Sequence, residues 1–507
     1  MKAKQIVVLL LLAAAAAADA LAAEDVVMPK GPCGSAPVAQ PQRRTAGESF
    51  PPLPLPATPM RRTEKKRPPA PPVLVAKIQF GDIKEVVRDG QPVRYYDWNK
   101  DPGDVDVLLN LGNHALSVQY TSKQGPLEAF DPDPAQYPVY YFTGSDDFVL
   151  TDAQVARLRD FLRNGGTVWG DTCFGDPDFF KAFTREMSRV LPDRDWHQLG
   201  PDHPLFRCYY RIDEVKYTRD VPDAPSGKGK PVLFGLDVAD RTAVILDRYG
   251  MSCGWDGHIR DGAYNVDPND ARRIGVNMMV YALGVHELAV YQSTAKVYYE
   301  ETERARGDFV FAQAKIVGNW DTESNEIANL LKLVSANTSA EVKFQRRAVD
   351  LVSDQLQQYP FLYITAREGF TLSDAQVQAL RRYLTSGGFL LASPSSGMSE
   401  FDVAFRREIA RVLPNHPLER LPAGHPAYSI LNKVDSVSYD DYVASLSETP
   451  PPLPLEGIDM GGTTAVIYCP YGIGGGWRGF DNPFGRDLAS ADASRLGVNI
   501  VLYAMTH

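Results

Sequence analysis

The stretch YPVYYFTGSDDFVLTDAQVARLRDFLRNGG at residues 137–166 returns as YPFLYITAREGFTLSDAQVQALRRYLTSGG at residues 359–388. The two stretches align without a gap at a shift of 222 positions, which is 359 minus 137. The same shift relates further pairs along the chain, namely Leu191 and Leu413, His203 and His425, Trp255 and Trp477, and Asn277 and Asn499. The chain is therefore a tandem duplication, and each copy repeats one set of elements.

The repeated stretch combines a strand with a capped helix. YPVYYFTG is rich in aromatic and β-branched residues, which is typical of a buried strand. Thr151 and Gln154 then form a capping box at the start of a helix, and Ser373 and Gln376 rebuild it in copy two. Strands that alternate with capped helices predict a parallel sheet covered by helices.

Several shorter runs predict further strands. Residues 73–80 and 309–316 read as the first strand of each copy, and residues 117–121 read as another buried strand. Residues 215–218, 231–238 and 241–250 predict additional strands, antiparallel at one edge of the sheet. Residues 82–94 are an excursion that copy two lacks.

At 507 residues the chain is too long for one ordinary core, and it fits two domains with extensions. The predicted boundaries are a signal peptide at 1–23, a proline-rich disordered linker at 24–72, copy one at 73–284, an interdomain linker at 285–307 and copy two at 308–507.

The N-terminus carries the pattern of an export signal. Lys2 and Lys4 precede an apolar run over residues 6–18, and residues 20–22 offer an A-x-A cleavage site. An uncleaved membrane anchor is the alternative. Cleavage would leave a protein without a membrane span, either periplasmic or secreted.

Charge and cysteine content exclude some classes of function. The chain has 53 basic and 63 acidic residues, so it lacks the positive surface that nucleic acid binding requires. It has five cysteines, Cys33, Cys173, Cys208, Cys253 and Cys469, and none lies in a C-x-x-C pair. This excludes a zinc ribbon and a thioredoxin-type redox motif.

Four motifs resemble a known bacterial family. These are W-x-x-D-P at residues 98–102, YPVYYFTG at 137–144, the glycine pair at 165–166 and DHPLF at 202–206. Together they resemble domain of unknown function 4159, in two copies over roughly residues 73–284 and 308–507. That family looks like a branch of the class I glutamine amidotransferase-like fold. The resemblance implies an α/β fold class with two tandem flavodoxin-like three-layer domains and mainly parallel sheets, and it implies no activity and no cofactor.

Ligands of open α/β sheets bind beyond the carboxyl ends of the strands. Trp98, Asp101, Gly144 and Asp171 follow predicted strands in copy one, so they are the candidate ligand-binding residues. Trp255 joins them as a ring on which a sugar or peptide could stack, although large aromatics at such positions are also common core residues.

Cys173 is the candidate nucleophile, because it lies between a strand and a helix where amidotransferase-like folds place one. Asp171 is a further catalytic candidate, although its carboxylate would oppose formation of the Cys173 thiolate. Copy two has Ser395 at the position of Cys173 and Ser393 at that of Asp171. A disulfide with Cys253 or Cys208 and a plain buried thiol are the alternatives.

His203 is a candidate base, or a structural histidine that caps a turn before proline. No second histidine is spaced to complete a metal site, so no metal is predicted. Asn277 and Asn499 are expected to bond loop backbone from the last helix of each copy.

Two hypotheses about function follow. The first is an exported, non-catalytic module of the cell envelope that binds a protein or glycan, or acts as a scaffold. The alternative is a thiol- or carboxylate-dependent hydrolase or transferase with its site in copy one and a degenerate copy two. The missing Cys-His-Glu triad favours the first.

Overall fold

The computed structural model describes residues 70–88, 91–257, 262–293, 309–344, 346–446 and 449–507. Pro72–His507 form one compact unit that contains both copies. The predicted signal peptide and nearly all of the proline-rich linker lie outside the described residues, as does most of the predicted interdomain linker.

Copy one is built on a seven-stranded sheet of order β4-β1-β5-β6-β11-β10-β7. Its strands are β1 (Val73–Gln79), β4 (Thr121–Pro126), β5 (Val139–Gly144), β6 (Thr167–Thr172), β7 (His197–Gln198), β10 (Leu233–Val238) and β11 (Arg241–Asp247). The first five strands of that order are parallel, and β10 and β7 add antiparallel strands at one edge. Numbered along the chain, the parallel strands follow the order 2-1-3-4-5 of a doubly wound sheet.

Copy two repeats this sheet in the order β13-β12-β14-β15-β18-β17-β16. Its strands are β12 (Ala312–Lys315), β13 (Arg347–Asp350), β14 (Phe361–Ile364), β15 (Phe389–Ala392), β16 (Glu419–Arg420), β17 (Glu456–Met460) and β18 (Thr463–Tyr468). The predicted α/β class with two tandem, mainly parallel sheets is therefore confirmed. The further likeness to amidotransferase-like folds stays a prediction.

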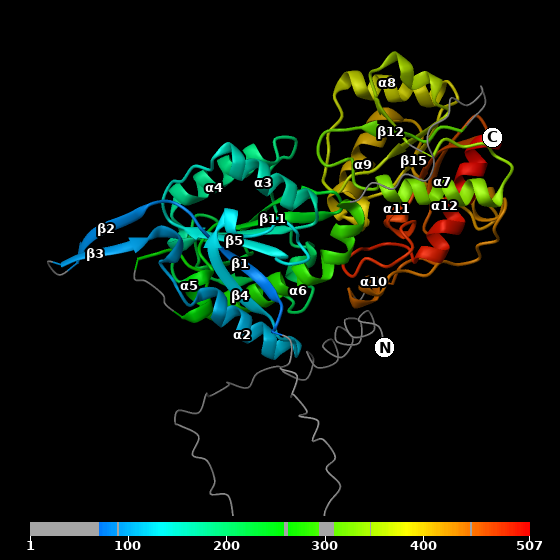
Figure 1. The fold of residues 1–507 in the computed structure, drawn as a ribbon. Coiled ribbons are helices and arrows are strands. Elements are labelled where there is room, and N and C mark those ends of the chain that lie inside the picture. The colour runs from blue at the N-terminus through cyan, green and yellow to red at the C-terminus, as the bar shows by residue number, and fades with distance from the viewer. Residues whose placement is uncertain (1–69, 89–90, 258–261, 294–308, 345, 447–448) are drawn as a thin grey trace, which may run out of the picture. The chain divides into compact units, whose positions relative to one another are not determined.

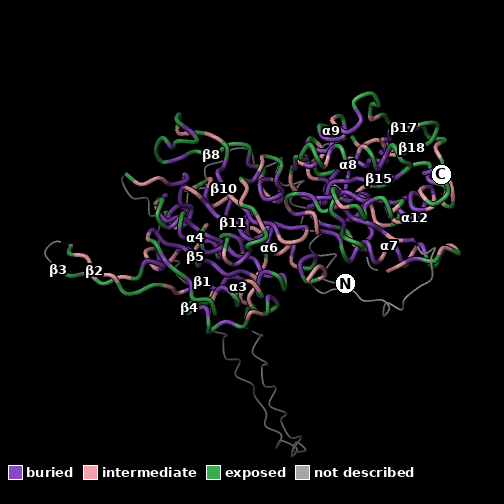
Figure 2. Tube along the Cα trace, turned by 90° about the horizontal axis from the view of Figure 1, so that it is seen from above, coloured by how far each residue is buried: buried purple, intermediate pink, exposed green. Residues whose placement is uncertain are grey.

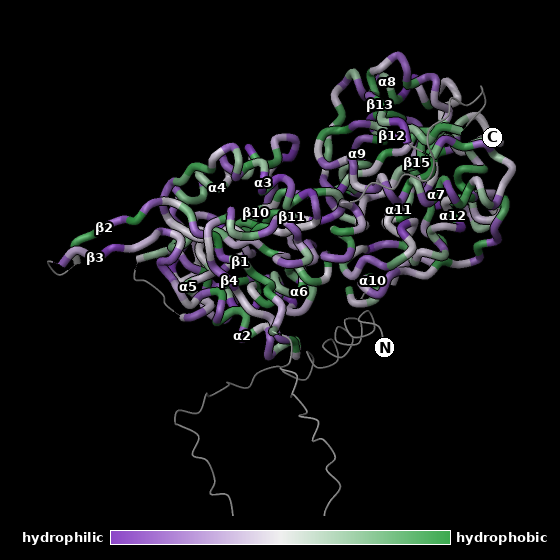
Figure 3. The backbone as a smooth tube through the Cα atoms, in the orientation of Figure 1, coloured by the Kyte–Doolittle hydropathy of each residue, from purple (hydrophilic) through white to green (hydrophobic). Residues whose placement is uncertain are grey.

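Helices cover both faces of each sheet (Figure 1). In copy one they are α2 (Asp104–Leu116), α3 (Asp152–Arg163), α4 (Pro177–Val190), α5 (Ser252–Asp256) and α6 (Pro268–Ser293). In copy two they are α7 (Ser324–Asn337), α8 (Asp374–Thr385), α9 (Ser399–Val412), α10 (Asp441–Ser445), α11 (Ile473–Gly476) and α12 (Ser490–Thr506). In copy two, one apolar cluster packs α8 and α9 against one face of the sheet. A second cluster packs α7 and α12 against the opposite face. The central strands are coloured mostly as buried in Figure 2 and as hydrophobic in Figure 3.

Both predicted capping boxes are confirmed. The Thr151 hydroxyl accepts from the Gln154 amide and the Gln154 side chain accepts from the Thr151 amide. Ser373 and Gln376 make the same pair of bonds in copy two. These reciprocal bonds fix where α3 and α8 begin, at the equivalent residues Asp152 and Asp374.

The structure corrects three predicted strands. β4 begins only at Thr121 and is largely exposed, because it is an edge strand with β1 as its single neighbour. The run at 241–250 is not an edge strand, since β11 pairs in parallel with β6 and all seven of its residues are buried. The run at 215–218 contributes only β8 (Val215–Lys216), which pairs with β9 (Lys228–Gly229) outside the main sheet.

Two further elements differ from the predicted pattern. The excursion at 82–94 forms a hairpin of β2 (Ile83–Arg88) and β3 (Gln91–Tyr96), which projects away from the sheet of copy one (Figure 1). Helix α6 continues to Ser293, beyond the predicted end of copy one. Its length and apolar composition would suit a membrane span, but 67% of its most apolar window is buried inside the protein, as in a core helix.

Candidate functional site

The carboxyl ends of the parallel strands in copy one enclose a buried ion pair. Lys77 on β1 donates to the Asp104 carboxylate at 2.7 Å and to the carbonyl of Asp101 at 2.7 Å. The hydroxyl of Tyr141 on β5 donates to the other oxygen of Asp104 at 3.1 Å. Burial raises the pKa of Asp104 to about 6, although Lys77 acts in the opposite direction. The pair therefore ties β1, β5 and the start of α2 together at the rim.

Asp171, a candidate catalytic and ligand-binding residue, accepts four hydrogen bonds from the protein. Its carboxylate receives the amides of Met251 at 2.7 Å and Ser252 at 3.0 Å, the Ser252 hydroxyl, and the Thr143 hydroxyl at 3.0 Å. The side chain thus joins β6 to the loop before α5. These bonds occupy both carboxylate oxygens, and a functional role for Asp171 stays a prediction.

Cys173, the candidate nucleophile, is buried beside Cys253. The contact with Cys253, burial and the charge of Asp171 together raise the pKa of the Cys173 thiol well above its ordinary value. The duplication aligns the two cysteines with Ser395 and Gly475, so copy two lacks both members of the pair. Cys173 and Cys253 are free thiols in the structure, so the disulfide alternative is not what it shows. The raised pKa also disfavours the thiolate that a nucleophile requires.

Position 144 has room only for glycine, because the side chain of Asp97 packs against its backbone. Asp97 accepts from the amides of Ser145 at 3.0 Å and Asp146 at 3.1 Å. A Cβ atom at Gly144 would lie 2.4 Å from Asp97 Oδ2 and 3.0 Å from the ring of Phe179. In copy two the residues at the positions of Gly144 and Asp97 are Ala366 and Asn319, so the turn is built differently.

The candidate stacking rings are buried. Trp98 is 5% exposed and Trp255 is 0% exposed. The Trp255 indole donates to the carbonyl of Ala271 on α6 at 3.1 Å, and the Trp477 indole donates to the equivalent Ala493 on α12 at 3.0 Å. A ligand could stack on Trp255 only after a rearrangement, and its binding role stays a prediction.

Asp101, a candidate ligand-binding residue, interacts with the carboxyl group of Asp256. Burial, together with a hydrogen bond to Asp256, raises the pKa of Asp101 to about 8. Asp101 is therefore mainly a neutral acid at pH 7. Asp256 was not among the residues predicted from sequence. It could have been found from the repeat, because copy two has Arg478 at the position aligned with Asp256.

His203 caps a turn, as one of its two predicted roles requires. Its Nδ1 accepts from the Leu205 amide at 3.2 Å, and its Nε2 lies 3.0 Å from the Thr242 hydroxyl. Burial lowers the pKa of His203 well below its ordinary value. His425 makes the same contacts in copy two, so the structural interpretation is confirmed for both.

The predicted roles of the two buried asparagines are also confirmed. Asn277 accepts from the Tyr210 amide at 2.8 Å and donates to the carbonyls of Leu205 and Tyr210. Asn499 repeats the pattern with the loop that contains Asn432. Each asparagine fastens a loop to the last helix of its copy.

The strand-end rim of copy two is occupied by copy one. The turn between β10 and β11 places Asp240 so that its carboxylate accepts from the hydroxyls of Ser395, at 2.8 Å, and Ser396. Arg367 of copy two donates to the Asp240 carbonyl at 3.1 Å. Ser395 stands where copy one has Cys173, so the turn fills the position that corresponds to the candidate nucleophile.

Buried charges surround this contact. Arg367 Nε lies 2.9 Å from the carboxylate of Asp237, and Arg478 lies 2.7 Å from Asp487 and 3.9 Å from Asp240. Burial raises the pKa of four neighbouring carboxyl groups, to about 7 for Glu326 and Asp487, to about 9 for Asp440, and well above the ordinary value for Glu323.

One group of side chains has the composition of a metal site. His197, Asp237 and Glu368 bring one ligand atom each to within 4.8 Å of one another. Asp237, however, is already paired with Arg367, whose positive charge would oppose a cation. We therefore interpret the group as part of the ion-pair network between the copies.

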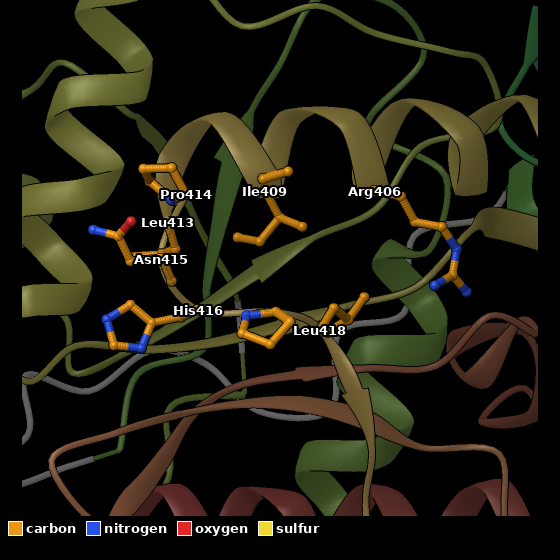
Figure 4. Close-up of a pocket in the computed structure, with 9 residues that line it drawn as sticks. Arg406, Ile409, Leu413, Pro414, Asn415, His416 and Leu418 are labelled. Carbon is orange, nitrogen blue, oxygen red and sulfur yellow. The ribbon is translucent and has the colours of Figure 1, made fainter.

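A cavity of about 280 Å³ lies at the C-terminal end of α9 (Figure 4). Ile409, Leu413 and Leu418 give it apolar walls, and Arg406 and His416 lie at its ends. None of the candidate site residues predicted from sequence lines it. It therefore adds no chemistry to the strand-end sites.

Comparison with known proteins returns one family. Its description is domain of unknown function (DUF4159), and its sequence model matches residues 86–283 and 310–505, one match in each copy. The two matches together cover more than half of the chain. No curated protein matches the chain.

Proposed function

Since this chain belongs to the DUF4159 family, which assigns it no activity, we propose its function from its two strand-end sites. We infer an exported, non-catalytic protein of the cell envelope that acts as a scaffold or binds a protein or glycan. In this proposal copy two has a structural role, because copy one covers its strand-end rim. Copy one then provides the surface that binds the partner.

The proposal rests on the environments of Cys173 in copy one and of Ser395, the equivalent residue in copy two. In copy two, Ser395 donates its hydroxyl to Asp240 of copy one, so it faces protein. In copy one, Cys173 is buried and its pKa is raised, so it is a thiol at neutral pH. Neither position offers the exposed, activated nucleophile that covalent catalysis requires.

Export rests on the sequence pattern of residues 1–23 and on the proline-rich segment that follows. Such a segment suits a tether between an exported domain and its surroundings. The net charge of −10 argues against a polyanion as the partner.

The test is the alkylation rate of each cysteine in the folded protein with iodoacetamide at neutral pH. We expect Cys173 to react as slowly as Cys208 and Cys469, whose thiols are also buried and have raised pKa values. All three should react only after unfolding. Fast, selective modification of Cys173 would overturn the non-catalytic proposal.

A specific observation favours a second candidate, a carboxylate-dependent hydrolase or transferase. Asp101 is a neutral acid beside Asp256, and a buried, protonated carboxyl group next to a second one is suited to general acid catalysis. Copy two replaces the pair with Glu323 and Arg478, as expected of a degenerate copy.

This candidate predicts that Asp101→Asn abolishes turnover of an envelope glycan or peptide while the protein stays folded. The matched control is Glu323→Gln in copy two, which should leave the turnover unchanged. If the unmodified protein shows no turnover with either class of substrate, the non-catalytic proposal stands.

A further inference from the structure

A cavity of about 310 Å³ lies where the two copies meet. Copy one contributes Arg207, and copy two contributes Ser399, Tyr442, Phe484 and Arg486. These residues come from four separate segments of the chain. Neither Cys173 nor Asp101 of copy one lines the cavity, whereas Ser396 of the copy-two rim borders it.

Hydrogen-bond donors converge on this cavity. Tyr442 is 8% exposed, and its hydroxyl has no hydrogen-bond partner among the described residues. The Nε atom of Arg207 is likewise buried without such a partner, while its Nη2 donates to Asp202 at 2.9 Å. A buried donor without an acceptor is costly, so these groups point to an acceptor that the protein itself does not supply.

The N-terminus of α9 adds further donors. Its N-cap residue is Met398, which has no side-chain acceptor, and no side chain caps the helix. In copy one the equivalent residue of α4 is Asp176, which accepts from the Asp178 amide at 3.0 Å. The first amides of α9 are thus left for an external acceptor, and the helix dipole favours a negative one.

Two carboxylates also line the cavity, and each already accepts hydrogen bonds from the protein. Asp202 accepts from Arg207 and, at 3.3 Å, from the Ser399 hydroxyl. Asp402 accepts from Arg406 at 2.9 Å and from Tyr468 at 2.6 Å. Both bonds to Asp402 fall on Oδ1, so protein donors neutralise the two carboxylates in part, and the cations of Arg207 and Arg486 line the same cavity.

We propose that this cavity binds an oxyanion, the phosphate or carboxylate group of a small ligand, between Arg207, Tyr442 and the N-terminus of α9. Copy one does not repeat these groups at the aligned positions, because Tyr442 corresponds to Asp220 and Arg486 to Tyr264. The proposal does not depend on whether either strand-end site is catalytic.

The test is titration calorimetry of the full chain with inorganic phosphate and with acetate, each against chloride at equal ionic strength. We expect one of them to bind and to raise the melting temperature. Tyr442→Phe and Arg207→Gln should each weaken binding by about tenfold, the loss of one charge-assisted or buried hydrogen bond. Tighter binding of phosphate would indicate a phosphorylated ligand, and tighter binding of acetate a carboxylate.

Arg211→Gln is the matched control, since Arg211 also pairs with an aspartate, Asp213 at 2.8 Å, but lies exposed outside the cavity. It should leave anion binding unchanged. Absence of binding by both anions would overturn the proposal, as would equal affinities for Tyr442→Phe, Arg207→Gln and the unmodified protein. Melting curves without anion establish that each variant is folded.

Discussion

Replacement of Asp240 by alanine is expected to lower the free energy of unfolding by about 3–5 kcal/mol, the usual cost of removing one partner from a buried ion pair. Asp240 is 2% exposed, and its carboxylate faces Arg367 at 3.5 Å and Arg478 at 3.9 Å. Without it, two buried guanidinium groups lose a counter-ion, and the Ser395 hydroxyl loses its acceptor. Urea unfolding of the full chain measures the change.

Two variants separate this effect from general damage to the turn. Asp240→Asn keeps an acceptor for Ser395 but removes the charge, so it should cost less than alanine. Asp213→Ala removes an exposed ion pair with Arg211 and should cost about 1 kcal/mol or less. If Asp240→Ala is no more destabilised than Asp213→Ala, the turn of copy one does not hold the two copies together as described.

The duplication made the layout of the fold predictable from sequence. Two copies of one pattern place the capping residues Thr151 and Ser373 and the turn-capping His203 and His425 at equivalent positions, and the structure confirms these roles. Such contacts are local, so a short sequence window contains both partners. The parallel sheet followed from the alternation of strands and helices.

The position of β11 within the sheet was not predictable in this way. A run of apolar residues indicates a strand but does not say which strands become its neighbours. The sequence suggested that the run at 241–250 is one of several antiparallel strands at one edge, whereas β11 lies inside the sheet, parallel to β6. The pairing depends on contacts with residues more than 70 positions away, since Val168 is the partner of Val244.

The contact between the copies was missed for the same reason. Asp240 reads as an ordinary turn residue, and its partner Ser395 lies 155 positions away. The signal in the sequence was a break in the repeat, because copy two has Gly462 where copy one has Asp240. Asp256 and Arg478 are another such break. Departures from the duplication therefore mark residues whose contacts are not repeated in the other copy.

Replacement of Lys77 by methionine is expected to lower the free energy of unfolding by about 3–5 kcal/mol at pH 8, because it leaves Asp104 buried without its cation. Lys77 is 4% exposed and Asp104 is 0% exposed. Thermal and urea unfolding between pH 4.5 and pH 8 measure the effect. The penalty should grow with pH for the following reason.

Burial raises the folded pKa of Asp104 to about 6, above the ordinary value of 3.8, so the folded state holds this proton more tightly than the unfolded state does. The group therefore lowers stability as pH rises from about 4 to about 6. Without Lys77 the folded pKa rises further, and this loss continues to higher pH. At pH 4.5 Asp104 is mostly protonated in the variant, so the penalty should be small.

Lys77→Met combined with Asp104→Asn should recover most of the stability at pH 8, because neither of the two positions then carries a buried charge. Gln313→Met is the matched control in copy two, where Gln313 occupies the position of Lys77 and donates to the Trp320 carbonyl at 2.8 Å. Its cost should not depend on pH, because the bond it removes is neutral. An equal penalty for Lys77→Met at pH 4.5 and pH 8 would show that the lysine stabilises copy one by packing and not by its charge.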